Sequence, residues 1–328
     1  MSKHTAAALL TALLLAAALA PRSSSQAQAP VLPTLRSANG ALIEMTERTS
    51  AATEGTADET DHSDALAADM ANGRWTRGFI QHRIVHFSFD DGPRPSTTRR
   101  LLAQLDEYDI RATFFVVGRN LEGRRHAEER ALIREMARRG HTLGSHTWDH
   151  ANLTTLSDAQ IESQIDRTEA VFEETLGDRP YLFRPPYGAR NQHIDELLAS
   201  RGYTEMLWNL SSMDTRTRDP EAMMESFRAQ LDRQERHPRG PGGIILVHDT
   251  HEHSVDAFPM MVEELRARNC ELLDQEGEEL WDIADDPRIF FQERGAGRNR
   301  MARDVTLDDE TIAARQEIVR AQAVEYCR

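Results

Sequence analysis

The stretch Ile84-Val85-His86-Phe87-Ser88-Phe89-Asp90-Asp91-Gly92 decides the fold that the rest of the chain must adopt. Residues 84–89 form a short run dominated by apolar and aromatic side chains, which is typical of a buried strand. Asp90 and Asp91 follow directly, and Gly92 marks a turn. The sequence therefore predicts a core strand that delivers two carboxylates to its carboxyl end.

Strand and helix patterns alternate on the C-terminal side of this stretch. Further strands are predicted at 112–117, 141–145, 181–183, 203–209 and 243–247, with a seventh candidate at 270–273. Helices are predicted at 96–108, 126–139, 158–176, 191–201 and 254–268, and another begins at Asp219-Pro220. This alternation implies an α/β fold with a parallel sheet. Six or seven such units fit a barrel or near-barrel better than a small open sheet.

The two ends of the chain are predicted to lie outside this fold. Residues 6–20 form an apolar run followed by small residues, which is typical of a secretory signal peptide; an uncleaved anchor is the alternative. The predicted organisation is a signal peptide (1–27), a polar linker or arm (28–80), one functional domain (81–289) and a C-terminal extension with a helix from Thr306 (290–328). We therefore expect an exported protein, periplasmic or extracellular, with no membrane span once the signal is cleaved.

Composition excludes several classes of function. The formal net charge is −15, so a phosphate backbone would be repelled and nucleic acid is not expected as a partner. Lys3 is the only lysine and lies in the predicted signal, which excludes Schiff-base chemistry and a phosphate-loop lysine in the mature chain. The composition does not predict an oligomeric state.

The chain has two cysteines, Cys270 and Cys327, and neither lies in a CxxC spacing. In an exported protein they can pair, and two free thiols fit the sequence equally well. A bond between them would tie the C-terminal tail to the main domain.

Charged or imidazole groups follow five of the predicted strands. Asp90 and Asp91 follow the first, His146 the third, Arg184 the fourth, Asp214 the fifth and His248 the sixth. Because the carboxyl ends of parallel strands meet at one edge, we expect these groups to form one site. Each of these groups, taken alone, could instead have a purely structural role, as part of a solvated turn, as a partner in a surface ion pair, or as a core histidine.

His146 and His150 stand four residues apart in His146-Thr147-Trp148-Asp149-His150. On one helical turn this spacing brings both rings to the same metal ion, although a chance pair gives the same spacing. Asp91 completes a set of two histidines and one carboxylate, which leaves coordination positions open. Such a set suits Zn²⁺, and Fe²⁺, Co²⁺ or Ni²⁺ could use it.

Together these residues resemble the polysaccharide deacetylase family, carbohydrate esterase family 4, also called the NodB-homology domain. The resemblance spans about residues 82–285. Its motifs stand here as Ser88-Phe89-Asp90-Asp91-Gly92, His146-Thr147-Trp148-Asp149-His150, Arg184-Pro185-Pro186-Tyr187-Gly188 and Leu246-Val247-His248. The resemblance implies a distorted (β/α)7-type barrel and the metal-dependent deacetylation of an acetylated carbohydrate.

The resemblance also implies a role for each motif residue. Asp91, His146 and His150 hold the metal ion. Asp90 is the base that takes a proton from the attacking water, and His248 is the acid that protonates the leaving group. Arg184 holds Asp90, and Asp214 orients His248. Tyr187 supplies a backbone N–H to the oxyanion, and Pro186 and Leu246 join it on the substrate side.

The fourth family motif departs from the pattern. Trp208 is followed by Ser211 where the family has Asp, and Asp214 is followed by Thr215 where it has Trp. Stacking of a polymer on that wall is therefore in doubt. N-deacetylation of N-acetylglucosamine units, O-deacetylation of a xylan-like ester and hydrolysis of a small amide stay open. A sugar-binding protein without catalysis is the remaining alternative, and it would need neither Asp90 nor His248.

Overall fold

The computed structural model describes residues 74–291 and 307–328. The predicted signal peptide, almost all of the predicted linker and residues 292–306 lie outside the described residues. None of the helices within the described part is both long enough and apolar enough to cross a membrane.

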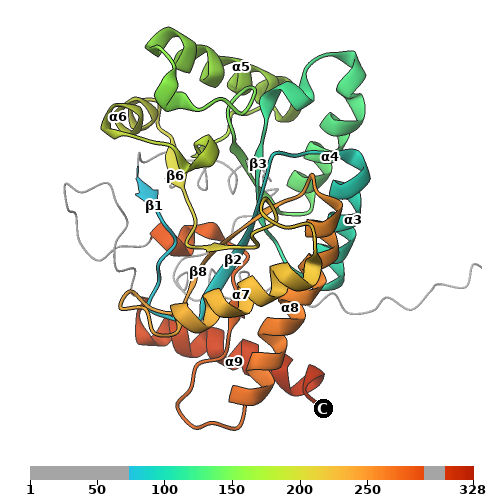
Figure 1. Cartoon of the computed structure of the whole chain (residues 1–328), viewed down its shortest axis with the longest axis vertical. Coiled ribbons are helices and arrows are strands. Elements are labelled where there is room, and N and C mark those ends of the chain that lie inside the picture. Colours follow the sequence, from blue (N-terminus) through green and yellow to red (C-terminus); the bar gives the residue numbers. More distant parts are fainter. Residues whose placement is uncertain (1–73, 292–306) are drawn as a thin grey trace, which may run out of the picture. The chain divides into compact units, whose positions relative to one another are not determined.

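A curled sheet of parallel strands forms the centre of the fold (Figure 1). Its strand order is β1-β6-β5-β4-β3-β2-β8-β7, and β9 pairs with the start of β2. The bounds are β1 Trp75–Thr76, β2 Ile84–Asp90, β3 Thr113–Val116, β4 Thr142–Ser145, β5 Leu182–Phe183, β6 Thr204–Met206, β7 Leu210–Ser211, β8 Gly243–His248 and β9 Asp282–Ile283. Within the described residues no pairing joins β7 to β1, so the sheet is a half-barrel of the (β/α)7 kind.

Helices connect the strands, as the alternating pattern predicts (Figure 1). Their bounds are α3 Pro95–Glu107, α4 Ala127–Arg138, α5 Asp158–Leu176, α6 Gln192–Ser200, α7 Pro220–Gln234, α8 Glu252–Leu272 and α9 Asp309–Tyr326. The short 3₁₀ turns are η1 Gly118–Leu121, η2 Arg124–His126, η3 Leu153–Thr155, η4 Pro186–Gly188 and η5 Pro287–Phe291. α5 begins at the predicted Ser157 capping box and ends at Gly177, which adopts a left-handed φ of 85°.

β2 is the central strand of the core, and all seven of its residues are buried. Phe87 meets Phe258 of α8 edge-on with ring centroids 5.0 Å apart, and Phe89 stacks on Phe114 of β3 at 5.2 Å. Phe87 and Phe89 are two residues apart, so they share one face of β2, and Phe258 of α8 packs against both rings. The apolar run at residues 84–89 therefore fixes where the two carboxylates leave the core.

Two predictions about strands are wrong in detail. The predicted strand at 203–209 is divided into β6 and β7, which pair with different partners. Residues 270–273 are not a strand, because α8 continues through Leu272. Phe258, Val262 and Leu265 continue with Asn269 on one buried helical face, and this spacing outweighs the local strand propensity of a four-residue run.

A disulfide joins Cys270, near the end of α8, to Cys327, directly after α9. Val319 and Ala323 of α9 pack with Leu280 in a small apolar cluster at the same place. The C-terminal helix is therefore fastened to the domain both by a covalent bond and by burial, and Figure 1 shows it (red) beside α8.

The double change Cys270→Ser and Cys327→Ser is expected to lower the free energy of unfolding by about 2–4 kcal/mol, because the bond closes a long loop in the unfolded chain. Urea unfolding followed by circular dichroism measures the difference. The oxidised protein treated with reductant should match the double variant. Equal stability of the variant and the oxidised protein would contradict the expectation.

Candidate active site

The groups that follow the strands meet at one edge of the sheet. β2 and β8 pair in a register that sets Asp90 opposite His248. β4 leads into His146, and β5 leads into Arg184. The loop after β7 brings Asp214 to His248. The structure thus brings together residues that are up to 158 positions apart in the chain.

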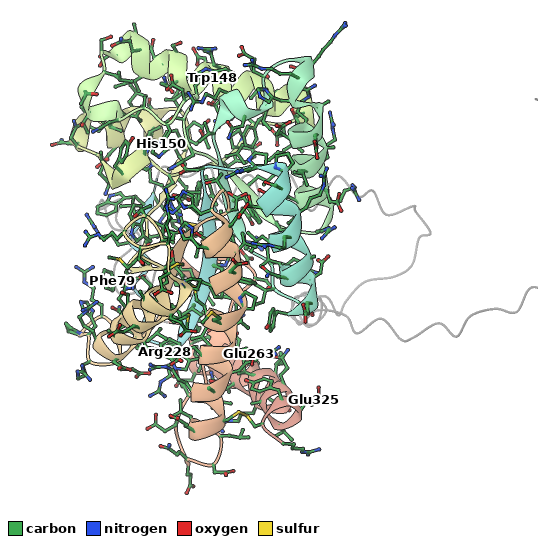
Figure 2. The ribbon with its side chains drawn as sticks, turned by 45° about the vertical axis from the view of Figure 1, so that its right-hand side comes forward. Phe79, Trp148, His150, Arg228, Glu263 and Glu325 are labelled. Atoms are coloured by element: carbon green, nitrogen blue, oxygen red, sulfur yellow. A yellow bond between two sulfur atoms is a disulfide. The ribbon has the colours of Figure 1, made fainter. Side chains whose placement is uncertain are left out.

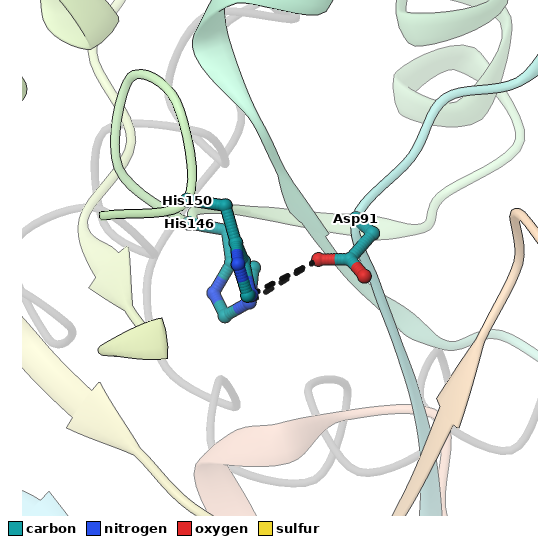
Figure 3. Close-up of side chains that lie close together, drawn as sticks. All are labelled: Asp91, His146 and His150. Carbon is teal, nitrogen blue, oxygen red and sulfur yellow. Dashed lines mark ion pairs between the residues drawn. The ribbon is translucent and has the colours of Figure 1, made fainter. Parts of the chain in front are cut away.

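Asp91, His146 and His150 converge on one point (Figure 3). Asp91 Oδ1 lies 3.6 Å from His146 Nε2 and 3.4 Å from His150 Nε2. One ligand atom from each residue lies within 4.8 Å of the others. The three residues therefore form a group that could hold a divalent metal ion.

Three observations support this fit. Asp91 Oδ1 is buried and has no hydrogen-bond partner among the described residues, which is costly for a carboxylate oxygen unless an ion occupies the site. His146 Nδ1 donates to the Arg184 carbonyl at 2.7 Å and so leaves Nε2 directed to Asp91. Burial lowers the pKa of His146 to about 3, which keeps the imidazole neutral as metal binding requires.

The four-residue spacing suggested that the two histidines lie on one helical turn, but the structure shows that they do not. Residues 146–150 form a non-helical turn in which Thr147 and His150 have φ values of 68° and 65°. Gln164 Oε1 on α5 accepts a hydrogen bond from the Trp148 backbone N–H at 2.8 Å and holds the turn in place. This reversal of the chain, rather than helical periodicity, brings the two ring centroids to 4.9 Å.

A second set of ligand atoms, from Asp214, His248 and His251, also lies within 4.8 Å. Here the carboxylate already has partners: Asp214 Oδ1 accepts from His248 Nδ1, and Oδ2 accepts from Ser254 Oγ at 2.7 Å. Because Asp91 Oδ1 has no such partner, the set of Asp91 is the better metal site.

Asp90 is held by a buried arginine. Arg184 Nη1 donates to Asp90 Oδ1 at 2.7 Å, and Nη2 donates to Ser88 Oγ at 2.9 Å. Burial raises the pKa of the Asp90 carboxyl, and the neighbouring Arg184 opposes that shift. Asp90 Oδ2 lies 3.6 Å from His146 Nε2. One oxygen of Asp90 is thus fixed by the ion pair, while the other faces the candidate metal site.

His248 and Asp214 form a second tightly held pair. His248 Nδ1 donates to Asp214 Oδ1 at 2.9 Å, and the His248 backbone N–H donates to Oδ2 at 2.8 Å. Burial by itself lowers the pKa of His248, but the hydrogen bond and charge of Asp214 outweigh it and raise that pKa to about 9. His248 is therefore protonated at neutral pH, and Nε2 is the nitrogen left for a substrate.

The residues predicted on the substrate side lie at the same edge. Pro186 and Tyr187 belong to η4, in which Tyr187 adopts a φ of 63° and is 68% exposed. The Tyr187 ring meets His150 edge-on with centroids 4.7 Å apart. Leu246 lies in β8, two residues before His248. Their contacts with a substrate stay a prediction.

Two supporting residues, Asn120 and Thr98, were not singled out from the sequence. Asn120 Nδ2 donates to the Asp91 carbonyl at 2.9 Å. Thr98 Oγ1 donates to the buried carboxylate of Asp249, and burial raises the pKa of Asp249 to about 7. A side chain at Gly92 would overlap that carboxylate. Asp249 directly follows the motif residue His248. Asn120 and Thr98 adjoin no motif residue, so no local sequence pattern indicates their role.

The altered fourth motif leaves no aromatic surface at Thr215, which is exposed. Trp208 is half-buried and packs against Gly188, where an added Cβ would lie 3.1 Å from the indole ring. Trp208 therefore serves packing under η4, and Thr215 offers no ring on which a sugar could stack.

Comparisons with known proteins identify relatives of this chain. The polysaccharide deacetylase family model matches residues 80–206. The chain is 33% identical over 191 residues to the peptidoglycan-N-acetylmuramic acid deacetylase of Bacillus subtilis, which covers 58% of this chain and 38% of that protein. It is 31% identical over 217 residues to chitin deacetylase 1 of Cryptococcus neoformans, covering 58% and 44%. The chain thus spans about two fifths of the length of these curated relatives.

The solved chitin deacetylase from the fungal pathogen Colletotrichum lindemuthianum is similar in both sequence and structure. The identity is 31% and the TM-score 0.52, with 58% of this chain and 84% of that chain covered. The fold is that of the carbohydrate esterase class of proteins to which this solved structure belongs. The chain belongs to the polysaccharide deacetylase family, carbohydrate esterase family 4, and the predicted fold class is confirmed.

His146→Ala is expected to abolish metal binding, because it removes the most buried of the three proposed ligands. Metal content per chain after dialysis, measured by atomic emission, should fall from about one ion to nearly none. His150→Ala, at a half-buried position, should do the same with a smaller effect on folding. His193→Ala, at an exposed histidine paired with Asp158, is the control and should keep the ion. Unchanged metal content in the His146 and His150 variants would refute the assignment.

Proposed function

We propose that this protein hydrolyses the N-acetyl group of N-acetylglucosamine units in an acetylated polysaccharide or oligosaccharide. The observation that carries the proposal is the pairing of Asp90 and His248 on neighbouring strands, each held by a buried partner of opposite charge. A base and an acid so placed can act on the two sides of one acyl group. A sugar-binding protein without catalysis would need neither.

Zn²⁺ is the cofactor that we propose, held by Asp91, His146 and His150. Two imidazoles and one carboxylate with open positions suit it, and Co²⁺, Ni²⁺ or Fe²⁺ fit the same donors. When bound, such an ion lowers the pKa of a water molecule and polarises an acyl oxygen.

The residues of the chain supply the proton transfers. Asp90 Oδ2 accepts the proton of the attacking water while Arg184 keeps the carboxylate in place. The Tyr187 backbone N–H stabilises the oxyanion, with Pro186 and Leu246 shaping that side of the site. His248 Nε2 donates its proton to the leaving amine, because Nδ1 is bound to Asp214. The products are acetate and a deacetylated sugar.

Hydrolysis of a smaller amide is the second candidate. The exposed Thr215, in place of an aromatic residue, favours it because one stacking surface for a long polymer is missing. O-Deacetylation of a xylan-like ester uses the same groups, with an alcohol as the leaving group.

We also propose that the protein acts outside the cytoplasm, with residues 81–289 as its catalytic domain. The apolar run at residues 6–20 supports export. The disulfide between Cys270 and Cys327 supports an oxidising compartment. Every proposed site residue falls between Asp90 and His248.

Acetate release tests the reaction. The protein should release acetate from N-acetylchitooligosaccharides, peptidoglycan fragments, acetylated xylan or a simple aryl acetate, and a chelator should stop the release. Asp90→Asn should lower kcat by about 100-fold or more while metal content stays unchanged, because it removes only the base. Release that persists in this variant would contradict the role of Asp90. No release from any of the four substrates, with metal bound, would contradict the proposed function.

The pH dependence tests the proposed acid. Since His248 must be protonated, kcat/KM should fall on the alkaline side near the pKa of about 9. Asp214→Asn removes the charge that raises this pKa, so the alkaline limb should move to lower pH by roughly one unit or more. Ser254→Ala removes only one hydrogen bond to Asp214 and should shift the limb less. An alkaline limb that is the same in the wild type and in Asp214→Asn would rule His248 out as the acid.

A further inference from the structure

A polar pocket of about 400 Å³ lies beside the candidate metal site. Residues of η1 and η2 line it on one side. Trp148 and Asp149 line it on the other, in the turn between the two metal-site histidines; Figure 2 labels Trp148 and His150 of this turn. The Arg119 backbone N–H donates to the Trp148 carbonyl at 2.8 Å, and Asn120 Nδ2 donates to the Asp91 carbonyl at 2.9 Å. The wall of the pocket is therefore bonded directly to the segments that carry the proposed metal ligands.

The pocket is lined by two guanidinium groups that are not paired with any carboxylate of the described residues. Among the described residues, the side chains of Arg119 and Arg125 have neither an ion-pair nor a hydrogen-bond partner. Of the two acidic residues of the pocket, Glu122 lies 3.5 Å from Arg167, and Asp149 accepts a hydrogen bond from the neutral side-chain amide of Gln164 at 2.8 Å and keeps its negative charge. Two free guanidinium groups thus share this pocket in a chain whose net charge is −15.

The side of the pocket that Trp148 forms is well packed. Trp148 is only 5% exposed, and the Arg167 guanidinium lies 3.9 Å from its ring centroid. His126 Nδ1 donates to the Glu122 carbonyl at 2.7 Å, which holds η2 against the start of its own loop. The side chains of Arg119 and Arg125 are therefore unpaired, while hydrogen bonds hold the backbone segments that carry them. A planar guanidinium binds a carboxylate with two parallel hydrogen bonds, so an oxyanion is the ligand that suits them.

We propose that this pocket binds a carboxylate on a sugar next to the one that loses its acetyl group, and so selects acidic acetylated glycans over neutral ones. The inference rests on the proposed function and names its substrate class. Without such a pocket, the acidic surface would repel an anionic glycan. The lactyl group of N-acetylmuramic acid and a uronic acid branch both present this carboxylate.

Two matched pairs of substrates test the proposal. The first pair is a peptide-free tetrasaccharide of alternating N-acetylglucosamine and N-acetylmuramic acid, and N-acetylchitotetraose. The second is an acetylated xylo-oligosaccharide with and without a glucuronic acid branch. For each pair, the ratio of kcat/KM for the acidic over the neutral member is measured in the wild type and in the double variant Arg119→Gln, Arg125→Gln. Arg124→Gln is the control, because Arg124 is exposed in the same turn but does not line the pocket.

In the wild type, the acidic member of at least one pair should be preferred, and that pair identifies the source of the carboxylate. The ratio of kcat/KM for the acidic over the neutral member should be about tenfold lower in the double variant than in the wild type, equivalent to ~1.4 kcal/mol. The Arg124 variant should keep the wild-type ratio. Added salt should reduce the ratio in the wild type and not in the double variant. No preference in the wild type, or a ratio that the double variant keeps, would overturn the pocket assignment alone. Acetate release from none of the substrates would instead refute the proposed function.

Discussion

The buried ion pair of Arg184 and Asp90 is the constraint on which the rest of the site depends. Both side chains are almost fully shielded from water, so neither charge is tolerable without the other. Loss of one partner of such a pair costs about 3–5 kcal/mol. The guanidinium also donates to the Met206 carbonyl at 2.7 Å and lies 4.1 Å from the ring centroid of Phe115. One side chain therefore ties together the carboxyl ends of β2, β5 and β6.

The same residue organises the candidate metal site through its backbone. The Arg184 carbonyl accepts from His146 Nδ1 and so decides which nitrogen of that ring faces Asp91. On the other side of β2, Asp214 plays the matching part for His248. Each proposed catalytic group is thus oriented by a buried partner, and the surrounding turns and 3₁₀ segments are free to serve substrate selection.

The sequence predicted the order of strands and helices because their periodicity is local, and it predicted the cluster because strand ends share one edge. It could not predict features that depend on contacts distant in the chain. The turn at residues 146–150 is held by Gln164 of α5, and Asp91 is anchored by Asn120, which lies 29 residues away. The run at 270–273 was misread because four residues do not reveal that they continue the buried face of a long helix.

The register of β2 and β8 has a consequence for how such a protein changes over time. Asp90 and His248 are direct partners in the ladder, so the distance between them follows from the spacing of adjacent strands, about 4.8 Å. A slip of one residue would turn one of them to the opposite face, and with it every side chain of that strand. No gradual drift in side-chain packing can therefore separate the two groups. The proposed reaction would thus be inherited with the backbone, whereas the proposed choice of glycan would depend on residues that can be exchanged one at a time.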